Sequence, residues 1–280
     1  MKRDINYKIK MNNGIEIPKF GLGVYLTKSG TECVNAVTWA LEAGYRHIDT
    51  ARIYGNEKEV GEAVRNSGIK RDQLFITTKL WNDDQGYDSA LAAFDLSLKK
   101  LDMEYVDLYL IHWPSPKRGL YVETWKALEE IYRQGRAKAI GVSNFHKQHL
   151  DELMANAKVT PAVNQIELHP DLPQLELRAY CEKLGIIVES WSPIGGGGGS
   201  LLSQPILATI GQKYGKSPAQ VVIRWHIQNG LVVIPKSSHV ERIQQNIDVF
   251  DFELSYDDME LINGLASDNR VGPNPDTADF

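Results

Sequence analysis

Short apolar segments alternate with longer amphipathic segments along almost the whole chain. Eight short segments have the composition of strands, and they cover residues 19–23, 45–49, 74–80, 106–112, 137–142, 162–167, 186–191 and 231–235. Each is followed by a segment with the period of a helix, at residues 34–44, 57–66, 91–101, 121–132, 146–156, 176–184, 204–214 and 240–246. Strict alternation of strand and helix predicts parallel strands joined by helical crossovers.

Two further patterns flank this regular alternation. Residues 7–11 and 15–18 alternate around Asn12, Asn13 and Gly14, which predicts a β-hairpin because glycine adopts positive φ without strain. Residues 217–228 and 257–265 also have the helical period. We therefore expect extra helices near the C-terminus, followed by a tail in a loop conformation.

A closed (β/α) barrel and an open, doubly wound sheet both fit this alternation. A doubly wound nucleotide-binding sheet would carry G-x-G-x-x-G after a strand, and no strand here is followed by that motif. Gly21-Leu22-Gly23 lacks the third glycine, and the five glycines at residues 195–199 are more typical of a flexible loop. We predict an α/β fold: one (β/α)8 TIM barrel over residues 1–280, with the hairpin closing its bottom.

The composition narrows the class of protein without naming a function. The formal net charge of −5 argues against a nucleic-acid or anionic-membrane surface, and no apolar run approaches the length of a membrane span. The N-terminus lacks the apolar core of a signal peptide, and Cys33 and Cys181 both fall in predicted helices, as buried structural thiols do. We expect a cytoplasmic monomer with no nucleic-acid, membrane or metal partner.

Polar or aromatic residues stand at the C-terminal ends of seven consecutive predicted strands. From the second strand to the eighth they are Asp49, Lys79, His112, Ser143 with Asn144, Gln165, Trp191 and Lys236, and Tyr54 follows five residues after Asp49. Each residue alone has a structural explanation as a solvated charge, a hydrogen-bonded side chain or part of the core. Because the C-terminal ends of barrel strands surround the active site, their recurrence there favours a functional site.

Four of these residues make chemical sense as a group. An unperturbed phenol has a pKa of about 10, which is too high for titration near neutrality. A lysine ammonium about 4 Å from Tyr54 would favour phenolate by about 4 kcal/mol at an effective dielectric constant of about 20. Asp49 would keep Lys79 charged, and His112 would direct a hydrogen bond to the same oxygen. Such a site can give a proton to a carbonyl oxygen that is receiving negative charge, for which a hydride is the natural partner.

The last predicted strand leads into a candidate phosphate site. Ser237 or Ser238 could cap the helix that follows, whose N–H groups bind anions, and Lys236 and Arg242 add two cations. The loops after strands seven and eight of barrels often hold a phosphate. A nucleotide with an additional phosphate fits this pattern, whereas a capped helix with solvated charges is the structural alternative.

Seven segments together resemble the aldo-keto reductase family. They are GYRHIDTARIYGNE, ITTKLWN, DLYLIHWP, IGVSNF, NQIELHP, WSPIG and IPKSSHVERIQQN. They occur in order, and the resemblance runs over essentially the whole chain, from Gly21 to the tail. The chain is most similar to small bacterial and protozoal members, of the diketogluconate reductase-like and prostaglandin F synthase-like kinds. The resemblance implies an NADPH-dependent barrel enzyme that reduces aldehydes and ketones.

The resemblance also implies roles for individual residues. The catalytic tetrad falls on Asp49, Tyr54, Lys79 and His112, with Tyr54 as the general acid. The cofactor residues are Ser143, Asn144 and Gln165 at the nicotinamide carboxamide, Trp191 stacked on the nicotinamide ring, Ser192, Ile194 and Gly195 over the pyrophosphate, Gly23 and Val24 beside the cofactor, and Lys236, Ser237, Ser238, Arg242, Gln245 and Asn246 at the adenosine phosphate. The substrate pocket falls on Tyr25, Trp81 and Trp113.

Some positions depart from the family pattern. Tyr25 stands where many members carry Trp, and Arg52 occupies a position that is usually small, where it could clash, attract anions or point away. The glycine run after Ile194 is unusual for the loop that covers the cofactor. The loop after His112 and the tail are both short, so we expect an open substrate pocket.

Two other functions remain as alternatives. The first is a cofactor-binding regulatory or structural barrel with little catalysis, which the intact tetrad argues against. The second is a carboxylate-based hydrolase that uses Glu167 and Glu189, which lie in predicted strands, although structural hydrogen bonding is the simpler role for both. A hydrolase would leave Tyr54 and Lys79 without a purpose.

Overall fold

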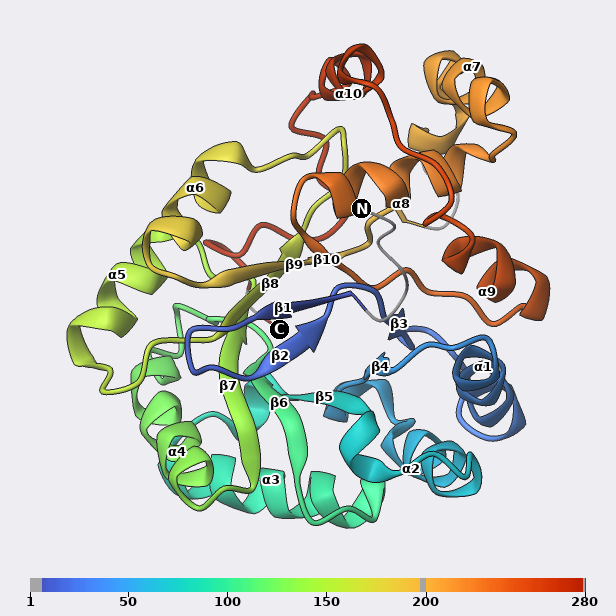
Figure 1. The fold of residues 1–280 in the computed structure, drawn as a ribbon. Helices are drawn as coiled ribbons and strands as arrows, with labels where there is room; N and C mark the ends of the chain where they lie inside the picture. The colour runs from blue at the N-terminus through green and yellow to red at the C-terminus, as the bar shows by residue number, and fades with distance from the viewer. Residues whose placement is uncertain (1–6, 197–199, 279) are drawn as a thin grey trace.

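Eight parallel strands form the centre of the molecule (Figure 1). The computed structural model describes residues 7–196, 200–278 and 280. The strands are β3 (Leu22–Gly23), β4 (His47–Asp49), β5 (Phe75–Leu80), β6 (Val106–Ile111), β7 (Ala137–Ser143), β8 (Val163–Glu167), β9 (Ile187–Trp191) and β10 (Val232–Val233). Each is hydrogen-bonded to the next in sequence order, and parallel bridges from Phe20 to Val233 and from Gly23 to Lys236 join the last strand to the first. The sheet therefore closes into the predicted (β/α)8 barrel.

Helices surround the barrel on its outside, as the ring of coiled ribbons in Figure 1 shows. They are α1 (Thr31–Glu42), α2 (Glu57–Asn66), α3 (Tyr87–Leu101), α4 (Tyr121–Arg133), α5 (Lys147–Asn156), α6 (Leu175–Lys183), α7 (Pro205–Tyr214), α8 (Pro218–Gln228), α9 (Val240–Ile247) and α10 (Tyr256–Asn263). The two predicted extra helices are α8 and α10. Local sequence explains where α8 begins: Ser217 and Gln220 form a capping box, and Pro218 stands at the first helical position.

The N-terminal hairpin closes one end of the barrel, as predicted. Strands β1 (Lys8–Lys10) and β2 (Glu16–Pro18) pair antiparallel, and Gly14 in the turn has φ of 88°. Met11 and Ile17 are buried in one apolar cluster with residues at or near the beginnings of barrel strands, among them Phe75, Val163 and Val232. The strand beginnings are thus covered, and the strand ends are left for a site.

The tail after α10 was expected as a loop that leaves the pocket open, and it does run as a loop without a further helix or strand in its described residues. The backbone N–H groups of Val271 and Gly272 donate to the carboxylate of Glu167 at 2.5 and 3.0 Å. The N–H groups of Ser267 and Asn269 donate to the carbonyl oxygen of Asp171. These bonds fix the tail beside the C-terminal end of β8, where it lines the pocket described below.

The cysteines and the lengths of the helices were also the subject of predictions from the sequence. Cys33 and Cys181 are both buried and unpaired, as structural thiols are. Within residues 7–196, 200–278 and 280, no helix is both long enough and apolar enough to cross a membrane.

Candidate active site

One cavity of about 1170 Å³ opens at the C-terminal ends of the strands. Asp49, Tyr54 and His112 line one part of it, and Lys236 and Arg242 line another. The strand ends therefore bring two groups of predicted site residues into a single space.

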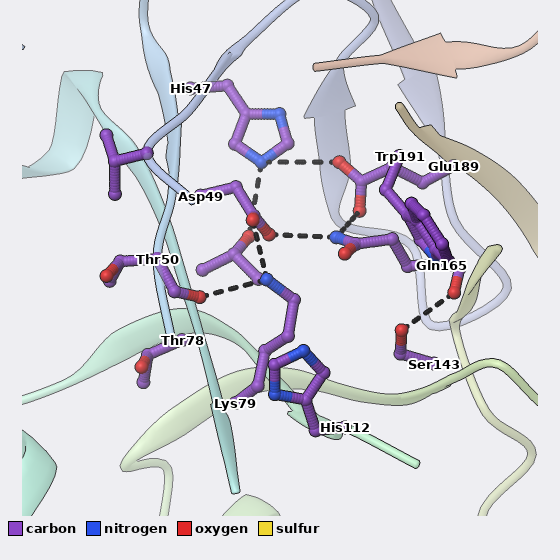
Figure 2. Close-up of polar contacts among 12 residues, drawn as sticks. His47, Asp49, Thr50, Thr78, Lys79, His112, Ser143, Gln165, Glu189 and Trp191 are labelled. Atoms are coloured by element: carbon purple, nitrogen blue, oxygen red, sulfur yellow. Dashed lines mark hydrogen bonds and ion pairs between the residues drawn. The ribbon is translucent and has the colours of Figure 1, made fainter. Parts of the chain in front are cut away.

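Asp49 and Lys79 form a buried ion pair beneath this cavity (Figure 2). Lys79 Nζ lies 2.5 Å from Asp49 Oδ1 and donates a second hydrogen bond to the carbonyl oxygen of Thr50 at 3.0 Å. Both side chains are almost completely inaccessible to solvent. Burial is the largest single influence and opposes the charge on Lys79, but Asp49, Tyr54 and Glu189 together outweigh it and raise the pKa of the ammonium. Lys79 is thus held as a cation inside the barrel.

Tyr54 ends a short 3-10 helix, η1 (Arg52–Tyr54), that the sequence pattern did not reveal. Gly55 follows with φ of 69°, a left-handed conformation that suits glycine and turns the chain into α2. The Tyr54 ring centroid lies 5.1 Å from Lys79 Nζ and 5.6 Å from the His112 ring centroid. The convergence of phenol, ammonium, carboxylate and imidazole that the sequence suggested is therefore present.

The expected lowering of the phenol pKa is not what the structure shows. Burial raises the pKa of Tyr54 to about 12, against the lowering influence of the Lys79 charge. Desolvation of the phenolate is therefore the larger effect in this site. Burial and the Lys79 charge also hold the pKa of His112 well below its usual value, so its imidazole is neutral near neutral pH.

Gln165 links the ion pair to a second buried acid (Figure 2). Its amide nitrogen, Nε2, donates to Asp49 Oδ2 and to Glu189 Oε2, both at 2.8 Å. Glu189 lies on β9 inside the barrel and is completely buried. From the sequence, Glu189 was expected in a strand, with a part only in the alternative hydrolase and otherwise a structural hydrogen bond. Its position two residues before Trp191 on the same strand face was the available signal.

Ser143, Asn144 and Trp191 form a connected group on the neighbouring strand ends. Asn144 Oδ1 accepts from the Trp191 indole at 2.8 Å, and Asn144 Nδ2 donates to the carbonyl oxygen of His112 at 3.0 Å. The hydroxyl of Ser143 donates to the carbonyl oxygen of Gln165 at 2.8 Å. These bonds fix Asn144, whose φ of 64° is rare for a residue other than glycine, at the edge of the cavity.

Known proteins resemble the chain along its whole length. A sequence model of the aldo/keto reductase family matches residues 20–267. The chain belongs to the aldo/keto reductase family. It is 52% identical to an uncharacterized oxidoreductase, YtbE, of Bacillus subtilis, covering 100% of both chains, and 51% identical to a glyoxal reductase of the same bacterium, covering 99% of each. A crystal structure of a Gox0644 variant in complex with NADPH is 48% identical, with a TM-score of 0.93 over 98% of this chain and 99% of the other.

Both the predicted fold and the predicted family are thus confirmed, and the chain is an oxidoreductase of this family. Of the residues predicted to form its site, most line the cavity: Gly23, Tyr25, Asp49, Tyr54, Trp81, His112, Trp113, Asn144, Gln165, Trp191, Ser192, Ile194, Lys236, Ser237, Ser238, Arg242, Gln245 and Asn246. Val24, Lys79, Ser143 and Gly195 are buried and do not line it.

The part of the cavity where a phosphate was predicted differs in detail from the sequence expectation. Neither Ser237 nor Ser238 caps α9, because that helix begins at Val240 with His239 at the N-cap position. Ser237 Oγ instead accepts from the N–H of His239 at 3.1 Å. Lys236 and Arg242 are both exposed, and neither forms an ion pair with an acidic residue in the part of the chain that the structure describes. Two such cations facing one cavity suit a bound phosphate.

The other end of the cavity is mostly aromatic and aliphatic. Trp81, Trp113 and Tyr25 line it as predicted, together with Leu26 and Ile53. Arg52 does not enter this space, because its guanidinium pairs with Asp84 at 2.7 Å. That contact decides between the three alternatives that the sequence left open for this residue.

Two groups of cavity residues were not predicted from the sequence. From the tail, Phe280 stacks on Trp81 with ring centroids 5.8 Å apart, and Val271, Gly272 and Pro273 line the wall beside it. At the start of α8, Ser217, Pro218 and Ala219 also line the cavity. The capping box of α8 was the available sequence signal for the second group, whereas nothing in the tail has a period that could place it.

Proposed function

We propose that this reductase converts aldehydes and ketones to alcohols with NADPH as the hydride donor and Tyr54 as the general acid. The observation that carries the proposal is the meeting of Tyr54, Lys79, Asp49 and His112 at the end of a cavity whose other end holds Lys236 and Arg242. The complex of a relative with NADPH and the name of the glyoxal reductase agree with it.

Bound NADPH would supply a hydride to the carbonyl carbon. The residues of the protein donate the proton and stabilise the negative charge that develops. Tyr54 donates its proton to the carbonyl oxygen as negative charge develops there. Lys79, kept charged by Asp49, then lies beside the phenolate and stabilises it. The pKa of about 12 means that Tyr54 keeps its proton until a carbonyl oxygen becomes basic enough to take it. Neutral His112 can offer a hydrogen bond to the same oxygen without repelling Lys79.

The shape and chemistry of the cavity suit the cofactor. Both N–H groups of Gln165 point toward carboxylates, so its carbonyl oxygen remains to accept from a carboxamide on the cavity side. Ser143 and Asn144 support the same edge, and Trp191 offers an aromatic face. Gly23 lines the cavity, and the buried Val24 follows it in the chain. Ser192, Ile194 and Gly195 lie in the loop after β9, and Ser237, Ser238, Gln245 and Asn246 line the cavity with the two cations.

The apolar end of the cavity points to substrates with an apolar body. Tyr25, Trp81 and Trp113 would contact such a substrate, while the polar groups near it are those of the tetrad. An aldehyde with an aromatic or alkyl substituent would bury that substituent and present only its carbonyl oxygen to Tyr54.

The direct test is NADPH consumption by the purified chain with a panel of aldehydes and ketones, together with NADPH binding in the absence of a carbonyl compound. We expect saturable binding and carbonyl-dependent loss of NADPH absorbance. Tight NADPH binding with no turnover of any carbonyl compound would instead support a regulatory or structural barrel.

A further inference from the structure

Glu189 is a buried acid that the proposed chemistry does not use. It lies two residues before Trp191 on β9, so both side chains project from the same face of the strand, toward the barrel interior. Trp191 lines the cavity, whereas Glu189 does not and is 0% exposed. Glu189 therefore sits one layer below the site and cannot touch a substrate.

A chain of hydrogen bonds connects Glu189 to the ion pair of the tetrad (Figure 2). Gln165 Nε2 donates one N–H to Glu189 Oε2 and the other to Asp49 Oδ2, and Asp49 Oδ1 accepts from Lys79. Because an amide nitrogen has only two N–H groups, these bonds fix the orientation of the Gln165 side chain. They also place the two carboxyl groups about 5 Å apart, as two acceptors of one amide nitrogen must be.

The groups around Glu189 cannot balance two negative charges. Among the residues that the structure describes, Lys79 on β5 is the cation acting on Glu189, and it pairs with Asp49. His47 on β4 has Nε2 3.6 Å from Glu189 Oε1 and 3.1 Å from the Thr77 hydroxyl oxygen. Burial lowers the pKa of His47 to about 3, so its imidazole is neutral. On the other flank, the β10 residue that pairs with Glu189 is the apolar Val232.

The carboxyl group that stays neutral is Glu189, because Asp49 has the direct contact with Lys79. Burial, followed by the charge of Asp49, raises the pKa of Glu189 to about 8. A neutral carboxyl can still accept from Gln165 through its carbonyl oxygen, so the hydrogen-bond chain survives in either form. Ionisation would add an uncompensated negative charge close to Lys79.

We propose that Glu189 is a positioning residue that acts as a neutral acid. It fixes the orientation of Gln165, and it adds no second negative charge near Lys79, so that Tyr54 can release its proton. Ionised Glu189 would oppose formation of the Tyr54 phenolate, since a second negative charge would then lie near the same ammonium. Reduction would slow as the pH rises through the titration of this buried acid. The inference rests on the proposed reductase function.

The test compares Glu189→Gln with the wild type, because glutamine keeps the shape and an acceptor for Gln165 but cannot ionise. The measurement is the single-turnover rate of NADPH oxidation with saturating NADPH and a small aldehyde, from about pH 6 to about pH 10. The wild-type rate is expected to fall at least about tenfold across an ionisation near pH 8, and the Glu189→Gln rate to stay level. An unchanged alkaline fall in Glu189→Gln would overturn the inference.

Glu167→Gln is the matched control, because Glu167 is a second buried glutamate at the neighbouring strand end that binds the tail rather than the ion pair. We expect it to keep the alkaline fall of the wild type. A control that also becomes level would assign the effect to the tail and overturn the role of Glu189. The wild-type turnover at neutral pH tests the reductase function separately. If the wild type consumes no NADPH at neutral pH, the proposed function is wrong, whatever the role of Glu189.

Thermal unfolding provides a second readout that does not need activity. The folded chain binds the Glu189 proton more tightly than the unfolded chain does, because the pKa of Glu189 is about 8 in the folded chain and about 4.5 in the unfolded chain. The stability of the wild type relative to Glu189→Gln should therefore be largest below about pH 4.5 and should decrease as the pH rises toward about 8. A difference in melting temperature that does not change with pH would contradict a neutral Glu189.

Discussion

Single side chains in this molecule owe their chemistry to burial as much as to their neighbours. Lys79 is completely buried and yet charged, since the Asp49 carboxylate lies 2.5 Å from its ammonium. Tyr54 lies beside that cation and still has a raised pKa, because desolvation of the phenolate is the larger effect. The charged neighbours of Tyr54 could be predicted from the sequence. The rise in its pKa could not, because desolvation depends on how the barrel packs around it.

The exposed cations Lys236 and Arg242 lead to a prediction about cofactor choice. A charged hydrogen bond to phosphate contributes about 1.5–3 kcal/mol, so Lys236→Ala and Arg242→Ala should each weaken NADPH binding about tenfold to about a hundredfold. NADH binding should change little, because NADH lacks the additional phosphate. Titrations of both cofactors against both variants provide the measurement.

An exposed lysine outside the cavity, Lys58, supplies the control for that comparison. Lys58→Ala should bind NADPH as the wild type does. If the wild type binds NADPH and NADH equally tightly, the assignment of this end of the cavity to the adenosine phosphate is wrong.

Among the segments of the chain, the tail contributes most to the site that the sequence did not predict. Glu167 accepts from two of its backbone N–H groups, and the tail carboxylate of Asp276 lies at the start of α5, where it contacts His146 at 2.9 Å and also Gln148. Phe280 then contacts Trp81 and Trp113. The tail is therefore a wall of the cavity, held by Glu167, by Asp171 and by the start of α5.

Gly272 is the position in the tail with the least room. A Cβ atom there would lie 2.5 Å from Trp191 Cη2 and 3.1 Å from Glu167 Oε2, so Gly272→Ala must displace the tail or the indole. Such overpacking costs about 1–3 kcal/mol, and we expect a lower melting temperature, a higher KM for carbonyl substrates and altered tryptophan fluorescence.

Gly264→Ala is the matched change, since its Cβ would meet only backbone oxygens at 3.4 and 3.6 Å, which is ordinary contact. It should leave melting temperature and KM unchanged. Identical behaviour of the two alanine variants would show that the tail does not press on Trp191.

The regular elements could be predicted from local pattern, while the tail and the short turns could not. The predicted helix over residues 57–66 has the same bounds as α2, since its apolar period and flanking turn are local signals. β3 and β10 are shorter than predicted. The strand predicted over residues 231–235 ends early as β10, because Pro235 has no N–H to donate to a neighbouring strand. η1 shows no period, and the tail is fixed by Glu167 and Asp171, roughly a hundred positions earlier in the chain.

Long-range register explains why the role of Glu189 was also missed. Alternation along β9 places it on the face of Trp191, but its link to Asp49 requires Gln165 of β8 to pair beside it. A prediction from sequence gives the face of each strand, whereas the stagger between strands decides which interior residues meet.

The molecule as a whole separates its stability from its chemistry at opposite ends of the barrel. The hairpin seals the beginnings of the strands with Met11 and Ile17, and the cavity lies at the other end. Conservative changes at the sealed end should therefore alter folding without altering catalysis.

Ile17→Ala tests this separation. Ile17 is 0% exposed, so the truncation should lower the free energy of unfolding by about 2–5 kcal/mol while kcat with a saturating aldehyde stays unchanged. Denaturant titration measures the first quantity, and one cooperative transition is expected if residues 1–280 form one domain, as we propose.

Ile15→Ala in the same hairpin is the comparison, because Ile15 is only half-buried and should lose less stability. A fall in kcat for Ile17→Ala under conditions where the variant is fully folded would contradict the separation of the two ends.

Tyr54→Phe is the variant that decides whether Tyr54 gives the proton, because only the hydroxyl is lost. The measurement is the single-turnover rate of NADPH oxidation by wild type and variant at saturating NADPH and aldehyde, with the NADPH dissociation constant determined for both. We expect the rate of Tyr54→Phe to be lower by about 10²–10⁴-fold or more, with a dissociation constant that changes by less than about twofold. Oxidation of NADPH by Tyr54→Phe at close to the wild-type rate would contradict this role of Tyr54.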